Sequence, residues 1–154
     1  METQVKLTAK VPQIQLRYRP KIKAADRVAI NGSKEANDIF RANWNEDTIN
    51  LQEQFKILLL DAGSRVIGIV QISSGGTTCT VADPRLIFAA ALKAGAKKII
   101  LAHNHPSGSL LPSADDKRLT EKLVHGGRLL EIEVIDHLIL AWDGHYSFCE
   151  NGLM

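Results

Sequence analysis

The sequence predicts a single α/β domain in which helices pack against a mixed β-sheet. The expected elements run in the order hairpin, helix, strand, helix and antiparallel end, which is typical of such a sheet. The 154 residues are enough to bury a core without disulfides or metals as staples. Hydrophobic residues make up 45% of the chain and charged residues 23%, with a net charge of +2, as in ordinary globular proteins.

A β-hairpin, a helix and a strand are predicted for the middle of the chain. The nearly continuous apolar run 55–60 (FKILLL) indicates a strand buried on both faces, and 66–73 is its expected hairpin partner. After a short connection at 77–81, a helix is predicted over 86–94, because it follows an Asp-Pro pair and precedes a glycine. The next strand, 98–102 (KIILA), is expected to deliver a histidine at its carboxyl end.

The last third of the chain is expected to form one more helix and an antiparallel end. Ser113 is a typical N-cap, so the helix is predicted to run from there to the glycine pair 126–127. Residues 129–135 and 138–141 are predicted as two separate strands. An Asp-Gly turn then leads into a final strand over 145–148.

Residues 1–27 are strongly basic. They hold seven Lys or Arg and two acids, a net charge of +5. Apolar and polar residues alternate over 12–23, which predicts a half-buried strand, and two prolines favour an edge strand or an extended arm. A charged edge that discourages aggregation is the favoured interpretation, and the alternative is an arm that contacts the phosphates of nucleic acid.

A short helix is expected after Ser33, with residues 36, 39 and 40 on its buried face, and residues 44–50 are expected to form a polar loop. We therefore divide the chain at residue 50. Residues 1–50 form a basic arm or edge strand and a short helix, packed on a domain that comprises residues 51–154.

The stretch from His103 to Asp116 (HNHPSGSLLPSADD) has the composition of a metal site. In an extended chain, residues i and i+2 point to the same side, so His103 and His105 can offer their imidazoles to one ion while Asn104 points away. The helix that starts at Ser113 would return Asp116 toward them. Two His and one Asp leave a tetrahedral zinc with one open position for water.

Other interpretations of these residues are open. Ser113 and Asp116 have the spacing of a capping box, which is compatible with a ligand role for the acid. His137 could be a fourth ligand, but a hydrogen-bonding or structural role is favoured. Cys79 and Cys149 are well separated and suit small core residues better than ligands or a disulfide.

The pattern His103-x-His105-Pro-x6-Ser113-x2-Asp116 resembles the JAMM (MPN+) signature of JAB-domain metallopeptidases. HNHPSG, PSxxD and IDHLIL resemble the RadC branch in particular, over about residues 50–153. The resemblance implies a JAB/MPN-type (cytidine-deaminase-like) fold and a zinc hydrolase. His103, His105 and Asp116 are then the zinc ligands, and Ser113 assists the tetrahedral intermediate.

The family pattern also implies an upstream Glu that acts through the water on the zinc. In RadC-like sequences an acid stands ahead of an aromatic residue and an apolar run, which indicates Glu53 as the general base. The simpler alternative is an exposed acid at the start of a strand. Glu35, Glu46 and Glu121 have weaker cases.

We therefore expect a zinc-dependent metallohydrolase, a peptidase or isopeptidase that acts on a peptide or protein substrate. The amide class is implied by the resemblance, because the residues alone fit any metal-assisted hydrolysis. The alternative is a DNA-associated, repair-related binding protein or a metal-dependent nuclease of the RadC family, which the basic N-terminal segment would suit. No apolar run is long enough to span a membrane and no secretory signal starts the chain, so the expected location is the cytoplasm. The sequence does not indicate an oligomeric state.

Overall fold

The computed structural model describes residues 12–15, 17–76 and 81–154. Its strands are β1 (Gln54–Leu60), β2 (Val66–Ser74), β3 (Lys98–Asn104), β4 (Glu133–Ala141) and β5 (Gly144–Ser147). Its helices are the 3-10 turn η1 (Ala24–Asp26), α1 (Ser33–Ala42), α2 (Glu46–Ile49), α3 (Pro84–Ala94) and α4 (Ala114–Leu129).

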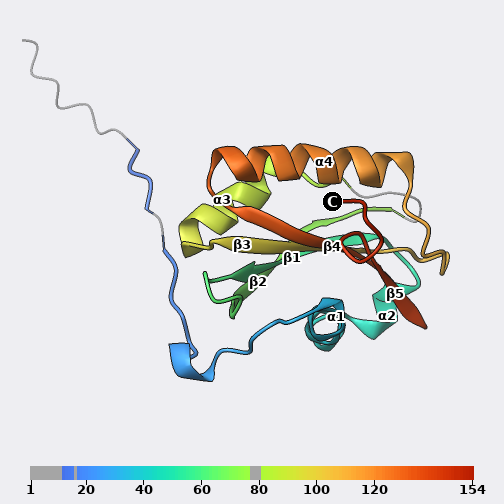
Figure 1. The fold of residues 1–154 in the computed structure, drawn as a ribbon, viewed down its shortest axis with the longest axis horizontal. Coiled ribbons are helices and arrows are strands. Elements are labelled where there is room, and N and C mark those ends of the chain that lie inside the picture. The colour runs from blue at the N-terminus through green and yellow to red at the C-terminus, as the bar shows by residue number, and fades with distance from the viewer. Residues whose placement is uncertain (1–11, 16, 77–80) are drawn as a thin grey trace, which may run out of the picture.

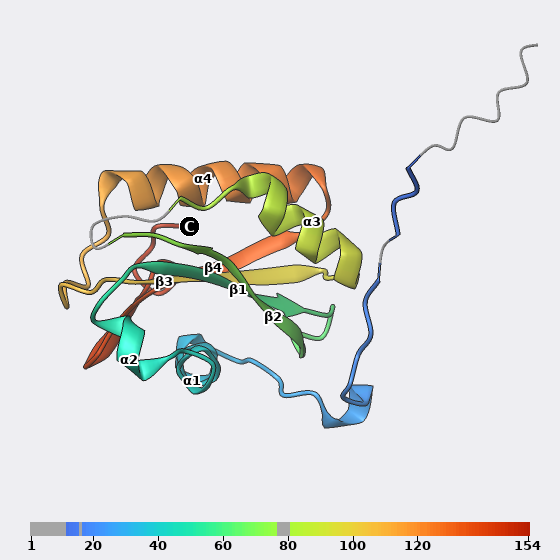
Figure 2. The same ribbon diagram turned by 180° about the vertical axis from the view of Figure 1, so that it is seen from behind.

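The five strands form one mixed sheet in the order β2-β1-β3-β4-β5 (Figure 1). Neighbouring strands are antiparallel except β3 and β4, which are parallel and are joined by α4. Helices α3 and α4 cover one face of the sheet, and α1 and α2 lie against the other (Figures 1 and 2). The predicted α/β class, with helices against a mixed sheet, is confirmed.

Each face of the sheet has its own hydrophobic core, because the strands at its centre are buried on both sides. The core beneath α3 and α4 includes Ile57, Ile87 and Leu123. The core beneath α1 includes Phe40 and Leu58. Every residue of β1 is buried, as its continuous apolar run predicted.

The predicted hairpin and the helix after it are confirmed. Strand β1 pairs with β2 across a turn that follows Leu60. Helix α3 begins after Asp83, whose side chain accepts the Arg85 N–H, and ends at Gly95, whose φ of 68° is the left-handed conformation that glycine favours. Most of the connection expected at 77–81 lies outside the described residues.

Helix α4 is longer than predicted, because Gly126 and Gly127 do not end it. It continues to Leu129. A Cβ atom on Gly127 would lie 2.3 Å from the carbonyl oxygen of Ile132, and one on Gly126 would lie 2.9 Å from the Phe88 ring. These glycines allow close packing against neighbouring elements, a requirement that the sequence alone does not distinguish from a helix end.

A single strand, β4, runs from Glu133 to Ala141 where two strands were predicted over 129–135 and 138–141, so this prediction was wrong. Asp136 and His137 lie inside β4 and are buried. Such a polar pair fits inside a strand because its hydrogen bonds are satisfied: the Asp136 carboxylate accepts from the Ser147 hydroxyl and from two backbone N–H groups.

The N-terminal region differs from the prediction in two places. Residues 44–50 are not a polar loop, because they contain α2, and Trp44 and Ile49 join the core beneath α1. Helix α1 has the predicted buried face, although its N-cap is Gly32. Residues 12–15 and 17–23 form no strand; they are an exposed, extended arm.

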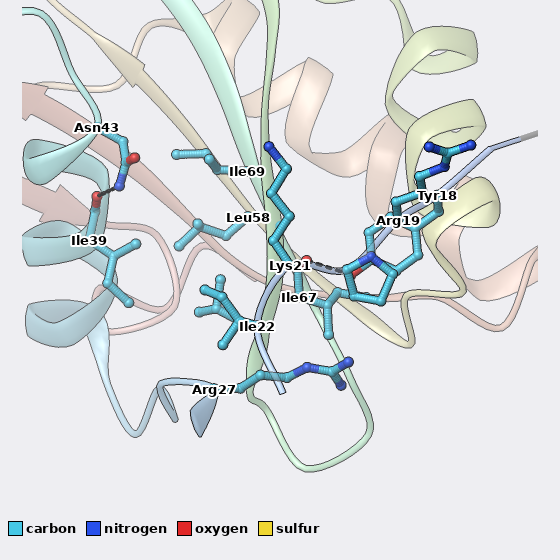
Figure 3. A pocket seen from close by; sticks show the side chains of 13 residues that line it. Tyr18, Arg19, Lys21, Ile22, Arg27, Ile39, Asn43, Leu58, Ile67 and Ile69 are labelled. Atoms are coloured by element: carbon cyan, nitrogen blue, oxygen red, sulfur yellow. Dashed lines mark hydrogen bonds between the residues drawn. The ribbon is translucent and has the colours of Figure 1, made fainter. Parts of the chain in front are cut away.

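The arm touches the sheet at the edge strand β2. The Tyr18 hydroxyl donates to the carbonyl of Ile67 at 2.7 Å. Between the arm, β2 and α1 lies a pocket of about 270 Å³ with an apolar floor and basic residues such as Arg19 and Lys21 at its side (Figure 3). Ile67 lies beside the Leu60 end of β1, whereas His103 pairs with Phe55 near the other end of that strand, so the arm meets the sheet at the end away from His103.

Candidate metal centre

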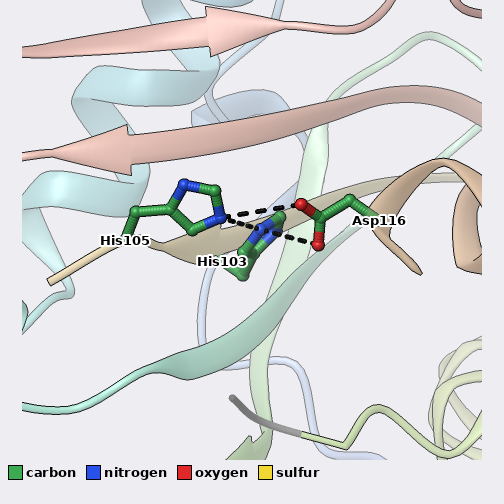
Figure 4. A group of neighbouring side chains, drawn as sticks. All are labelled: His103, His105 and Asp116. Atoms are coloured by element: carbon green, nitrogen blue, oxygen red, sulfur yellow. Dashed lines mark hydrogen bonds and ion pairs between the residues drawn. The ribbon is translucent and has the colours of Figure 1, made fainter. Parts of the chain in front are cut away.

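His103, His105 and Asp116 meet at one end of the sheet (Figure 4). His103 lies near the end of β3, and His105 follows in the next loop. The backbone N–H of His105 donates to the carbonyl of Leu140. Asp116 lies in the first turn of α4. In a β-α-β unit, the carboxyl end of the first strand faces the start of the following helix, so this topology brings the three side chains together.

The three residues each offer one ligand atom, and these atoms lie within 4.8 Å of one another, close enough for one metal ion. The Nε2 atoms of His103 and His105 are 3.0 Å apart. Asp116 Oδ1 lies 3.2 Å from His103 Nε2, and Asp116 Oδ2 lies 3.6 Å from His105 Nε2. Ligands of a tetrahedral zinc at bond lengths of about 2.0–2.1 Å are about 3.3–3.4 Å from one another. The three residues fit such an ion.

Asp116 also completes a capping box at the start of α4. The Ser113 hydroxyl accepts the Asp116 N–H at 3.0 Å, and Asp116 Oδ2 accepts the Ser113 N–H at 2.7 Å. These bonds fix the carboxylate with both oxygens toward the histidines, so the capping and ligand roles are compatible. Burial acts to raise the pKa of Asp116, but the two imidazoles and the Ser113 N–H hold it well below its usual range, so the group is a carboxylate.

A chain of hydrogen bonds that begins at Thr120 sets the tautomer of His103. The Thr120 hydroxyl lies 2.7 Å from the carbonyl oxygen of Asp116 and 2.6 Å from Nδ1 of His137. A hydroxyl has one proton, and a carbonyl can only accept. Both contacts are satisfied when Thr120 donates to the carbonyl and accepts the Nδ1–H of His137.

The tautomer of His137 determines in turn which nitrogen of His103 donates. Burial lowers the pKa of His137 well below its ordinary value, so the ring is neutral and its Nε2 is an acceptor. His137 Nε2 lies 2.8 Å from His103 Nδ1, which must therefore donate. In neutral His103, Nε2 then has a lone pair that points at His105 and Asp116. The favoured hydrogen-bonding role of His137 is supported, since both of its ring nitrogens are engaged away from the ligand atoms.

His105 is held in the same tautomer by a separate contact. Its Nδ1 lies 2.7 Å from the backbone carbonyl oxygen of Ser109, which can only accept, so Nδ1 carries the proton. In neutral His105, Nε2 thus has a lone pair. In neutral rings, two imidazole lone pairs and one carboxylate face the same point, an arrangement that a bound cation would satisfy.

In the absence of a metal, a proton is the other cation that can satisfy this arrangement. The hydrogen bond with Asp116 raises the pKa of His105, and the charges of Asp116 and Glu53 add to the effect. A proton on His105 Nε2 would therefore compete with a metal for the same position.

Glu53 lies immediately before β1 and is half-buried. Strand β1 is antiparallel to β3 with Phe55 opposite His103, so the start of β1 lies beside the end of β3. Alternation along the strand places Glu53 on the same face as Phe55, whose ring stacks on His103. The charge of Glu53 contributes to the raised pKa of His105, after the larger effect of Asp116. The role of Glu53 as base, like that of Ser113 as helper, stays a prediction.

A profile of the RadC-like JAB domain matches residues 30–153. This chain belongs to the RadC-like JAB domain family. The resemblance noted in the sequence is thereby confirmed, and the sheet with its flanking helices agrees with a JAB/MPN domain. The match begins at residue 30, so it includes α1 and α2 as well as the sheet.

Several relatives of this RadC-like chain carry the name UPF0758 protein. The one from Symbiobacterium thermophilum is 44% identical over 102 residues, which are 66% of this chain and 44% of the relative. The one from Alkaliphilus metalliredigens is 38% identical over 134 residues, 87% of this chain and 58% of the relative. One from Synechocystis is 48% identical over 96 residues, 62% of this chain and 40% of the relative. The chain thus spans about half the length of these relatives.

Sequence reasoning found the three residues of the metal cluster but missed the roles of Thr120, whose hydroxyl bonds to His137, and of Asn104, whose amide bonds to Gln52 and Gln54 on either side of Glu53. Thr120 gave no signal, because a Thr in the middle of a helix is common. Asn104 was expected only to point away from the metal. It does so, but a buried Asn at the end of an apolar strand was a signal that its amide has specific partners.

Two further expectations concern surfaces and partners. None of the helices in the described ranges is long and apolar enough to cross a membrane. Within residues 12–15 and 17–23, the basic side chains are exposed. Contact between this arm and nucleic acid stays a prediction.

Proposed function

We propose that this RadC-like chain is a zinc-dependent hydrolase of peptide or isopeptide bonds. The observation that carries the proposal is the convergence of two imidazole lone pairs and one carboxylate on a single point, with the tautomers of both histidines set by their other ring nitrogens. Ligand histidines in metal enzymes are usually oriented by such partners.

His103, His105 and Asp116 would hold the zinc. Zinc with three protein ligands keeps a position for water, lowers the pKa of that water and polarises a substrate carbonyl. The surroundings favour this chemistry because the site has apolar walls: the rings of Phe55 and Phe148 stack on His103 and His137. Low polarity strengthens electrostatic interactions at the site.

Glu53 and Ser113 would handle the proton and the developing charge. As the water oxygen attacks the carbonyl carbon, a carboxylate oxygen of Glu53 would take the water's proton and then give it to the nitrogen of the leaving amine as the C–N bond breaks. The Ser113 hydroxyl, while its oxygen accepts the Asp116 N–H, can donate its proton to the carbonyl oxygen as that atom gains negative charge.

The composition of the site favours amide over phosphodiester hydrolysis. Phosphodiesterases more often gather carboxylates around two metal ions. This cluster has two imidazoles and one carboxylate, a set that suits a single zinc. Membership of the JAB family supports the same reaction class.

The test is turnover by the zinc-loaded protein. A peptide and isopeptide library, single-stranded DNA and double-stranded DNA are each incubated with the wild type and with Asp116→Ala. We expect cleavage of amide substrates that the variant loses. Cleavage of DNA without cleavage of any amide, lost in the same variant, would overturn the proposal.

Glu53→Gln tests the assigned base. The amide is the same size but cannot accept the proton, so zinc content should stay at the wild-type level while turnover falls about 100-fold or more. Glu121→Gln, at an exposed acid on α4, is the matched control and should leave turnover unchanged. Equal turnover of Glu53→Gln and Glu121→Gln would move the base to another residue.

A further inference from the structure

Asn104 stands between the two ligand histidines and is completely buried. Strand alternation turns its side chain away from His103, toward the segment that joins α2 to β1. Its amide makes three hydrogen bonds there. Oδ1 accepts the N–H of Gln54 at 2.7 Å, and Nδ2 donates to the carbonyls of Ile49 at 2.7 Å and Gln52 at 2.9 Å.

The orientation of this amide follows from its partners. Ile49 and Gln52 offer carbonyl oxygens, which only accept, and Gln54 offers an N–H, which only donates. The reverse orientation would lose all three bonds. A fully buried amide with three hydrogen bonds is a rigid connection between two segments.

The bonds to Gln52 and Gln54 lie on either side of Glu53. The backbone of Glu53 is itself tied to the next segment, since its N–H donates to Gly76 and its carbonyl accepts from Gly75. Glu53 precedes the regular pairing of β1, which begins at Gln54. The position of its backbone relative to β3 therefore depends on the Asn104 amide.

We infer that Asn104 is a positioning residue that fixes Glu53 relative to the metal ligands. This inference rests on the proposed function, in which Glu53 is the base. Asn104 lies next to His103 at the end of β3 and directly precedes His105. By holding the segment of Glu53 against this strand end, the Asn104 amide therefore sets the distance between Glu53 and the two histidines. Displacement of a catalytic group by about 1 Å can cost about 100-fold in rate.

Removal of the Asn104 amide should affect Glu53 more than the metal. Asn104→Ala leaves the pairing of β3 with β1 and β4 intact, and the ligands keep their own supports at Ser109, Ser113 and His137. Ile49, Gln52 and Gln54 lose their hydrogen bonds to the Asn104 side chain. We expect zinc stoichiometry to stay at the wild-type level while the segment of Glu53 moves.

Cobalt spectroscopy measures the effect of this movement on the metal site without a substrate. Co²⁺ accepts the same ligand types as zinc, and its visible absorption responds to pH when a nearby water loses a proton. A carboxylate beside that water disfavours the loss of the proton, so Glu53→Gln should lower the midpoint of the spectral transition by about half a pH unit or more. Asn104→Ala should lower it in the same direction, and the double variant should match Glu53→Gln alone.

Asn37→Ala is the control, because Asn37 is also buried and bonded, to Arg41 Nε, but belongs to α1. It should leave the midpoint unchanged. If Asn104→Ala is unfolded, Asn104→Ser, whose hydroxyl can keep one of the three bonds, is measured in the same way. A midpoint in the folded Asn104 variant equal to that of Asn37→Ala, or shifts that add in the double variant, would overturn the inference. An unshifted midpoint in Glu53→Gln would instead remove Glu53 as the base, and with it the inference built on it.

Discussion

A single hydroxyl proton, that of Thr120, determines which ring nitrogen of His103 carries the proton in the neutral ring. Its direction follows from the two contacts of the hydroxyl oxygen, to a carbonyl and to His137. A protein site that binds zinc through imidazole needs this kind of control, because the wrong tautomer presents an N–H to the ion.

Thr120→Val removes the hydroxyl and keeps the shape of the side chain. His137 Nδ1 then has no acceptor, so the tautomers of His137 and His103 are no longer fixed. We expect zinc affinity, measured by competition with a chromophoric chelator, to fall about 10- to 100-fold. Thr120→Ser keeps the hydroxyl and should bind within a few-fold of the wild type; equal affinities of the two variants would contradict the assigned tautomers.

Asp136 gives a pH prediction at the residue scale. Burial raises its pKa, although the Ser147 hydroxyl and the N–H groups of His137 and Cys149 act to lower it. Because the folded pKa lies above the unfolded one, the native state binds the proton more tightly. The free energy of unfolding should therefore decrease as pH rises from the unfolded pKa through the folded pKa.

Asp136→Asn keeps the acceptor oxygen and removes the charge. The variant should be more stable than the wild type at pH 7, and the difference should shrink as pH falls through the folded pKa of Asp136. Urea unfolding of both proteins at several pH values measures this. A difference that is constant with pH would show that the charge of Asp136 has no role.

Helix α4 illustrates a constraint at the scale of the element. Gly127→Ala would place a Cβ atom against the backbone of Ile132, which cannot move aside as a side chain can. We expect it to lower the free energy of unfolding by about 1–3 kcal/mol. Gly126→Ala meets only the edge of the Phe88 ring and gains up to about 1 kcal/mol of helix propensity, so its cost should be smaller. Calorimetry in which Gly126→Ala is the more damaging change would contradict this account.

Helices α3 and α4 and strand β4 show which element boundaries can be predicted from the sequence. Local signals sufficed where the cause is local: Asp83 and Gly95 bound α3, and Ser113 begins α4. The end of α4 was missed because the reason for Gly127 is a neighbour outside the helix. Strand β4 was divided because Asp136 and His137 were read as a break, and their partners come from other elements.

At the scale of the molecule, the site is assembled from three segments that the topology brings together. The parallel pair β3 and β4, joined by α4, places His103 beside Asp116, and the antiparallel pair β1 and β3 places the start of β1 beside His103. The spacing of the two His and the Asp proposed as ligands was visible in the sequence because they lie on consecutive elements. The position of Glu53 was inferred from family pattern, since only the register of β1 against β3 relates it to the ligands.

Zinc content of the purified protein tests the central claim most directly. Elemental analysis of the wild type, His103→Ala, Asp116→Ala and the control His125→Ala, an exposed histidine on α4, compares the ligands with a residue of the same type. The account predicts about one zinc per chain in the wild type and in His125→Ala, and loss of stoichiometric zinc in the other two variants. Full zinc content in His103→Ala or Asp116→Ala would contradict it.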